Sequence, residues 1–206
     1  KLQATNTTQG NISITNTGSL TLTNLDGSKN AWDEYYSVWN NGAGNVYIEA
    51  KGSNADIIMQ EPNTIIAEAK GNISLIAGRD IRSDPNFTGA IVSDAGDILL
   101  QAGRNIEVYY WIESGKLTNG QIALTAGGDI TIGLKRITFF DENGAPLQAG
   151  TIKLTSGGSI TQAPGGSVGI VSEKLLLSAA NGITLPNIQV LKLQATNTTQ
   201  GNISIT

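Results

Sequence analysis

The first fifteen residues of the chain, KLQATNTTQGNISIT, occur again without a change at residues 192–206. An identity of this length does not arise by chance, so the chain holds one complete period of 191 residues and the beginning of the next. Tandem repetition is typical of extended proteins in which each unit buries its apolar surface against its neighbours. The repeat therefore predicts that 1–206 is a single segment of a longer array, with residues 1–191 as the unit.

A shorter motif, G-x-I-x-L-x-A/S-G-x-x-I, lies within the long period. Its full copies are GNISLIAGRDI (71–81), GDILLQAGRNI (96–106), GQIALTAGGDI (120–130) and GTIKLTSGGSI (150–160). Apolar residues alternate with polar ones in each copy, which predicts two short strands separated by a glycine corner. We expect like residues to stack in two core columns, Ile73, Ile98, Ile122 and Ile152 in one and Leu75, Leu100, Leu124 and Leu154 in the other.

The spacing of these copies predicts an all-β fold, a parallel β-helix (solenoid) with loop insertions. Eight to ten coils are expected in 191 residues, and Asn, Asp and Ser at the corners are expected to bond neighbouring backbone groups. Positive φ angles are expected at the corner glycines Gly78, Gly103, Gly127, Gly128, Gly157 and Gly158. A β-sandwich or barrel remains an alternative, because Asn-Gly pairs suited to hairpins occur at residues 41–42, 119–120, 143–144 and 181–182.

The composition removes several functional classes. The chain has no Cys and no His, which excludes thiol catalysis, disulfides and Ser-His pairs. Its net charge is −4 and it has no basic stripe, so nucleic acid is not an expected partner. No apolar run approaches the length of a membrane span. We therefore expect no membrane insertion, no cofactor and no bound metal.

The acidic residues leave an enzymatic alternative to weigh. Asp80, Asp84, Asp94 and Asp97 lie close in sequence with Arg79 and Arg82 nearby. Such a group could serve a polysaccharide-cleaving β-helix enzyme, since glycoside cleavage uses paired carboxylates. Asp80 and Asp97, however, occupy corner positions of the motif, which favours a role in turns and a protein that is not an enzyme. The acidic pairs 33–34 and 141–142 are interpreted as solvated loop charges, with weak divalent binding as the alternative.

Three insertions, at 28–43, 104–119 and 135–150, interrupt the coil rhythm and hold nine of the eleven aromatic residues. The candidate contact residues in them are Trp32, Tyr35, Tyr36, Trp39, Tyr109, Tyr110 and Trp111. Phe139 and Phe140 belong to the third insertion. The rings have three interpretations: they cover the flank of the helix, contact a neighbouring filament, or bind sugar rings. Asn-x-Ser/Thr triplets at Asn6, Asn11, Asn72, Asn86, Asn197 and Asn202 leave glycosylation open as well.

The motif pairs, together with the segment SVGIVSEKLLLSAANGITL (167–185), resemble the haemagglutinin-type repeats of filamentous haemagglutinin and related giant exoproteins of the two-partner secretion class. The resemblance covers residues 64–206 well and 10–58 more loosely. It implies a right-handed β-helical rod on a bacterial surface, hence an extracellular structural protein with a mechanical or adhesive role. Its partners would be further copies of itself, or glycans if the aromatic insertions make it an adhesin.

The repeated segment also gives an expectation for the two ends. Residues 192–206 should take the place of residues 1–15, one period further along the axis and with little change of conformation. Without the adjoining repeats, both ends expose unpaired strand edges. The isolated chain is therefore expected to associate end to end.

Overall fold

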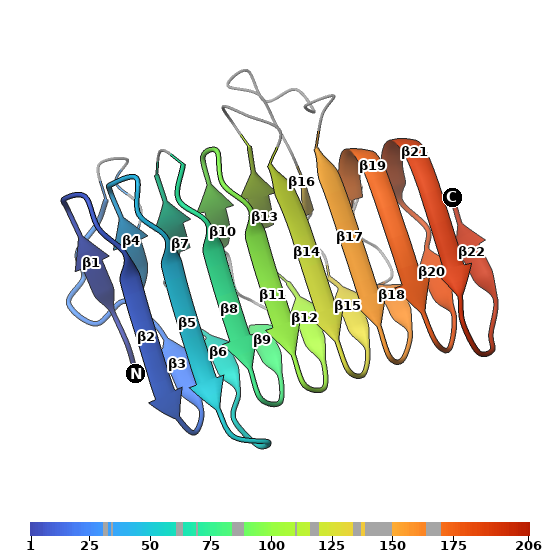
Figure 1. The fold of residues 1–206 in the computed structure, drawn as a ribbon, viewed down its shortest axis with the longest axis horizontal. Coiled ribbons are helices and arrows are strands. Elements are labelled where there is room, and N and C mark those ends of the chain that lie inside the picture. The colour runs from blue at the N-terminus through green and yellow to red at the C-terminus, as the bar shows by residue number, and fades with distance from the viewer. Residues whose placement is uncertain are drawn as a thin grey trace.

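The computed structural model describes residues 1–30, 33, 35–60, 64–68, 70–83, 89–109, 111–115, 120–133, 137–138, 150–163 and 170–206. In this part of the chain, strands wind into a parallel β-helix without any α-helix, and all pairs of strands are parallel (Figure 1). The front strands of Figure 1 run downward while the chain advances from left to right, so the helix is right-handed. The expected fold class is confirmed.

The strands lie on three faces, which we call A, B and C in the order in which the chain visits them. Face A holds β1 (Ala4–Asn6), β4 (Val38–Asn40), β7 (Thr64–Ala67), β10 (Ala90–Ser93), β13 (Trp111–Ser114) and β16 (Ile137–Thr138). Face B holds β2 (Ile12–Thr17), β5 (Val46–Lys51), β8 (Ile73–Ala77), β11 (Ile98–Ala102), β14 (Gln121–Ala126) and β17 (Thr151–Ser156). Face C holds β3 (Leu20–Leu22), β6 (Ile57–Met59), β9 (Ile81–Ser83), β12 (Ile106–Val108), β15 (Ile130–Ile132), β18 (Ile160–Gln162), β20 (Ile183–Leu185) and β22 (Ile203–Ile205).

Two long strands, β19 (Ile170–Ala179) and β21 (Ile188–Asn197), each pass from face A to face B. The first residues of β19 pair with β16 on face A, and its last six pair with β17 on face B. β21 pairs with β19 along both parts. These two strands join faces A and B into one hydrogen-bonded sheet and complete the seventh and eighth coils.

The core is a stack of like residues in register. Ile98 pairs with Ile73 and Ile122. Every residue of the two expected columns, from Ile73 to Ile152 and from Leu75 to Leu154, is at most 1% exposed. Ile130 and Ile132 resume the inward row on face C, also fully buried. Each such side chain contributes about 1.5–3 kcal/mol by leaving water. The core columns expected from the motif are therefore confirmed.

The corner glycines do not have the positive φ angles that the sequence suggested, so that expectation is wrong. Positive φ occurs instead at Gly10, Gly18, Gly27, Gly52, Gly115, Gly182 and Gly201 among the described glycines. A Cβ on Gly103 would overlap the carbonyl oxygen of Gly78 in the coil before it, and one on Gly127 would overlap that of Gly103. Glycine is required at these corners because successive backbones approach one another too closely for any side chain.

Side chains at two corners bond the backbone of the following coil, as expected for Asn, Asp and Ser. At the start of face B, Asn11 Oδ1 accepts from Asn45 N at 2.8 Å, and the pattern continues to the N–H of residues 72, 97 and 121. At the start of face C, Asn105 Oδ1 accepts from Asp129 N at 2.9 Å within a similar series that runs from Ser19 to Ser159. We call these series the B ladder and the C ladder. The side-chain oxygens of both ladders accept hydrogen bonds from corner N–H groups that have no partner in the paired strands.

The Asn-Gly pairs that allowed for hairpins do not form them where the structure describes both residues. Asn41-Gly42 leads from face A to face B, and Asn181-Gly182 leads from face B to face C. The one antiparallel contact in the described residues is an isolated bridge between Lys29 and Tyr35. A sandwich or an up-and-down barrel is therefore excluded for the described chain.

The two copies of the repeated segment lie on different faces. In the first copy, Ala4–Asn6 is on face A and Ile12 begins a strand on face B. In the second copy, residues 195–197 pair with 177–179 on face B, and Ile203–Ile205 pairs with β20 on face C. The expectation of the same place one period further along is wrong. From Ala4 to its copy Ala195 the described chain passes 22 strand positions: β1 to β18, both parts of β19, β20 and the first part of β21. This number is not a multiple of three, so the second copy begins on a different face.

The unit therefore spans seven and one third coils, fewer than the eight to ten expected. The difference arises because the insertions lengthen individual coils: from β1 to β4 the chain uses 34 residues per coil, whereas from β20 to β22 it uses 20. At about 4.8 Å between parallel strands, one unit advances about 35 Å along the axis.

Candidate functional site

Two of the candidate aromatic residues pack together on face A. The hydroxyl of Tyr36 accepts hydrogen bonds from the hydroxyls of Thr5 and Ser28, both at 3.1 Å, and the residue is 5% exposed. Its ring centroid lies 5.4 Å from that of Trp39. The indole Nε1 of Trp39 donates to Glu68 Oε1 at 2.8 Å. These rings bind the first insertion to coils one, two and three, which fits the flank-covering interpretation for these two residues.

Two other candidates present their rings to solvent. Tyr35 and Trp111 are each 43% exposed, and Lys29 Nζ lies 4.8 Å from the centroid of the Tyr35 ring. Trp111 begins β13, three coils after β4, so it lies about 14 Å along the axis from the Tyr36–Trp39 pair. Tyr109 is half-buried. Trp32, Tyr110, Phe139 and Phe140 lie outside the described residues.

Face A differs from a simple solvated sheet because some of its outward side chains are buried. The inward residues of this face are Val38, Ile65, Ile91, Ile112 and Ile170, all fully buried. Ile66 and Val171, which alternate with them, are 1% and 2% exposed. Strands buried on both sides carry continuous apolar runs, as Ile65-Ile66 does. We use the name aromatic flank for face A with Tyr35, Tyr36, Trp39 and Trp111.

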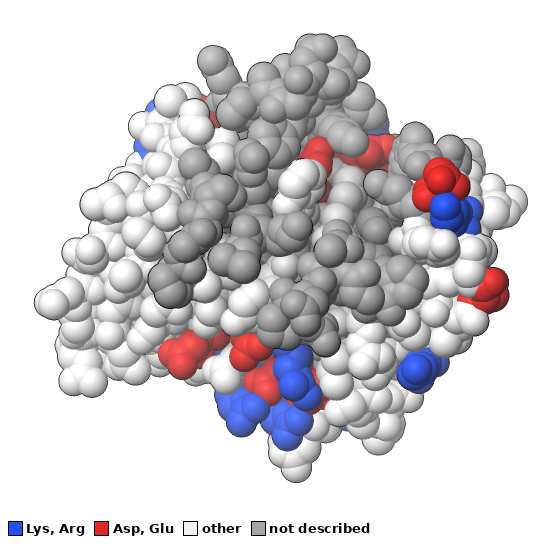
Figure 2. Space-filling model, turned by 180° about the vertical axis from the view of Figure 1, so that it is seen from behind, with Lys and Arg blue, Asp and Glu red and all other residues white. Residues whose placement is uncertain are grey.

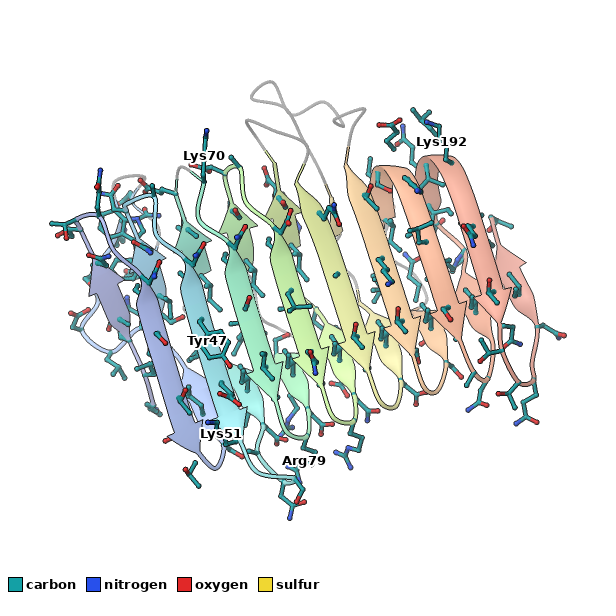
Figure 3. All side chains as sticks on the ribbon, viewed as in Figure 1. Tyr47, Lys51, Lys70, Arg79 and Lys192 are labelled. Carbon is teal, nitrogen blue, oxygen red and sulfur yellow. The ribbon has the colours of Figure 1, made fainter. Side chains whose placement is uncertain are left out.

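Opposite charges gather at the corner between faces B and C, where basic and acidic side chains lie side by side (Figure 2). Arg79 donates from Nε and Nη2 to the two oxygens of Asp56 at 2.7 and 2.6 Å, and Arg104 holds Asp80 in the same way one coil further on. Figure 3 shows Arg79 at this corner, below β8. The hydrogen bonds from Arg79 and Arg104 lower the pKa of Asp56 and Asp80 respectively, against an opposing effect of burial.

Asp56 and Asp80 do not suit the role of a general acid in glycoside cleavage. A general acid needs a raised pKa, whereas the pKa values of Asp56 and Asp80 are lowered. Asp80 and Asp97 act as acceptors in the C and B ladders, which supports their interpretation as turn residues. Asp84, Glu34, Asp141 and Glu142 lie outside the described residues. In the described ranges no group of three His, Cys, Asp or Glu is placed to hold a metal, and Asp33 pairs with Lys29 at 2.9 Å.

Sequence reasoning missed Asp56, the anchor of the Arg–Asp corner. It lies in the segment GNVYIEAKGSNADI (44–57), where three residues are added before the final Ile, so the alignment with the motif hides its equivalence to Asp80. The signal that could have found it is the Asp-Ile pair itself, which also occurs at the same corner at residues 80–81 and 129–130, and at the start of face B at residues 97–98. Arg79 and Arg104 follow the corner glycine in two consecutive motif copies and mark the same corner.

The last coil exposes apolar side chains that lie inside the core elsewhere. Leu193 pairs with buried Leu175 but is 46% exposed, and Ile203 pairs with buried Ile183 but is also 46% exposed. Leu191 is 70% exposed. At the other end, Leu2 bridges to Leu22 on face C and is half-buried. The C-terminal end of the helix is thus an apolar layer bordered by unpaired strand edges. Another coil can stack onto a surface of this kind.

The geometry defines the chain as a parallel β-helix whose repeated segment forms faces B and C of its last coil. No protein-family model, curated protein or solved structure matches it. In the described residues, no helix has the length and apolarity needed to span a membrane.

Proposed function

We propose that the chain is a segment of a structural rod, a giant extracellular filament at the cell surface built from tandem copies of the 191-residue unit. The observation that carries the proposal is the placement of residues 192–206. They continue the helix as an in-register coil over β19 and β20, so the start of a unit fits onto its own end. Backbone hydrogen bonds along the axis and the Ile and Leu columns supply the stiffness, and no reactive group is required.

Tandem chains of one to four units test this proposal. Each chain has n copies of residues 1–191 followed by residues 192–206. Small-angle scattering or negative-stain electron microscopy should give particles of constant width that lengthen by about 35 Å with each added unit. Particles that grow in all directions, or beads joined by flexible linkers, would contradict a continuous rod.

The cell-surface location rests on the resemblance to haemagglutinin-type repeats and has its own test. Intact cells of the source organism, treated with a protease and probed with an antibody against the unit, should lose the antigen while a cytoplasmic marker survives. Full protection of the antigen in intact cells would overturn the surface assignment and leave the rod architecture standing.

A glycan-binding adhesin is the second candidate, favoured by the exposure of Tyr35 and Trp111 on the aromatic flank. Aromatic faces of this kind can stack on sugar rings. Glycan binding that is lost in Trp111→Ala or Tyr35→Ala, but kept in Tyr47→Ala, would support it. Tyr47 is a matched control because it lies on face B, where its hydroxyl bonds Glu49 at 3.0 Å (Figure 3). Equal binding by all three variants would argue against the flank as a sugar site.

A further inference from the structure

The number of strand positions in one unit has a consequence for how units join. Three faces are visited in strict order, so a unit of 22 positions that begins on face A is followed by a unit that begins on face B. This is the reason that Ala4 lies on face A and its copy Ala195 lies on face B. The inference below rests on the rod proposed above and concerns whether this one-face offset is kept when whole units follow one another.

We propose that consecutive units are related by a screw operation, with an advance of about 35 Å and a rotation of one third of a turn. Three units, or 22 complete coils, bring the chain back to the same face after about 106 Å. The surface that receives each unit is the end of the preceding one: the second part of β19, β20 and the first part of β21.

The junction in this chain already shows the first two steps of that stacking. Leu193, Ala195 and Asn197 lie over Leu175, Leu177 and Ala179 on face B, and Ile203 and Ile205 lie over Ile183 and Leu185 on face C. The residues that point inward in the first copy point inward again in the second, so the alternation survives the change of face. The equivalent of β3 would then stack on Ile188–Val190 of face A, the next free position of the order.

The local structure of the segment is suited to either corner. In the first copy Asn6 Nδ2 donates to Gly10 O at 2.9 Å, and in the second Asn197 Nδ2 donates to Gly201 O at 2.7 Å. Gly10 and Gly201 both have positive φ. The same strand–turn–strand unit therefore joins A to B in one copy and B to C in the other, and the segment by itself does not select a face.

The proposed rotation changes how the rod meets its surroundings. The aromatic flank lies on face A of this unit, so it would lie on face B of the next unit and on face C of the one after. Exposed rings such as Tyr35 and Trp111 would then follow a spiral and face three directions, whereas without rotation they would form one stripe. A rod of this kind makes lateral contacts on all sides.

Cysteine pairs in a tandem chain, residues 1–191 followed by a further copy of residues 1–206, distinguish the two arrangements. The chain has no native Cys, so an introduced pair is unique. Ser204 is the copy of Ser13 and is interior in the tandem chain. With rotation it lies beside Thr184 on face C, its partner in the present register. Without rotation it would lie on face B beside outward-facing Leu176, which belongs to the same column of paired residues as Ser13.

The Thr184→Cys, Ser204→Cys pair should form a disulfide nearly completely under mild oxidation, measured as loss of free thiols, because neighbouring parallel strands are within disulfide range. The Leu176→Cys, Ser204→Cys pair should keep its free thiols. Thr131→Cys with Thr161→Cys, neighbours on face C in either arrangement, is the positive control. The reverse result would overturn the rotation. If the rotation fails while the tandem chain is still a rod, only this inference falls; a tandem chain no longer than one unit rejects the rod itself.

Discussion

Residues 1–15 and 192–206 share every side chain, yet the structure gives them different surroundings. Ile12 begins a strand on face B and is 8% exposed, while its copy Ile203 begins a strand on face C and is 46% exposed. Leu2 turns back under Leu22 on face C, whereas its copy Leu193 continues straight in β21 on face B. The segment determines the turn that precedes Ile12 and Ile203 and the choice of inward residues. The neighbouring coils determine the face, the burial and whether a corner precedes Ala4 or its copy Ala195.

The largest loss of stability is expected from a charge placed in the Leu column of the coils that lie between the two copies. Leu124→Asp places an unpaired charge in a dry column between Leu100 and Leu154, at a cost of several kcal/mol. Unfolding followed by circular dichroism should show a severe loss of stability or no folding. Ala123→Asp is the matched control, because Ala123 faces outward on the same strand. Similar melting of the Leu124 variant and the parent would mean that the inward assignment of this column is wrong.

The second effect compares the same substitution in the two copies. Ile12→Ala should cost about 2–4 kcal/mol, because it opens a cavity in a buried column, and Ile203→Ala roughly half of that or less, because much of the side chain is already solvated. In the tandem chain, where residue 203 is interior, the two costs should become equal. Chemical denaturation measures both. Equal costs in the single unit would contradict the difference in burial.

The third effect concerns the ladders. Asn11→Ala removes the acceptor of Asn45 N–H and should cost about 1–3 kcal/mol. Asn202→Ala, at the copied position on the last described coil, should change the free energy of unfolding by less than about 0.5 kcal/mol. Hydrogen exchange at the amide of residue 45 should quicken in the first variant alone. Slow exchange of this amide in Asn11→Ala would show that the ladder bond is unimportant.

The smallest effect is expected at the Arg–Asp corner, which belongs to neither copy. Because the folded pKa of Asp80 is lowered, its contribution is complete above the ordinary carboxyl value of 3.8 and is lost as the pH falls through the lowered folded value. Asp80→Asn keeps an oxygen for the N–H of Asn105 and should lower the melting temperature at pH 7 by about 2 °C or less. The difference between variant and parent should shrink below pH 4. A difference in melting temperature that stays constant from pH 7 to pH 2 would show that the charge of Asp80 does not contribute to stability.

The coil core was predictable because it depends on a local pattern. The alternation in 120–130 identifies the inward residues, and motif copies identify which isoleucines and leucines stack. The glycine roles were not predictable in the same way: a glycine required by a backbone in the next coil looks the same in sequence as one required by its own φ. Gly103 is of the first kind and Gly182 of the second.

The face of the second copy could not be predicted from the repeat alone. A period of 191 residues gives no whole number of coils, because the insertions vary in length and only the count of strands fixes the final face. β21 passes the corner between faces A and B as one continuous strand, so no glycine or turn marks that step in the sequence. Of the candidate site, the aromatic residues were predictable from their absence in the core. The burial of Tyr36 and the exposure of Trp111 depend on neighbours from other coils.

We propose that a unit of 22 strand positions turns the helix by one face as it repeats. Cryo-electron microscopy of a tandem chain of six units yields the rotation and the rise that relate neighbouring units. We expect a rise of about 35 Å with a rotation of one third of a turn, so that the aromatic flank returns to the same side after about 106 Å. A density that repeats at every unit with no rotation would overturn the proposed screw relation between units.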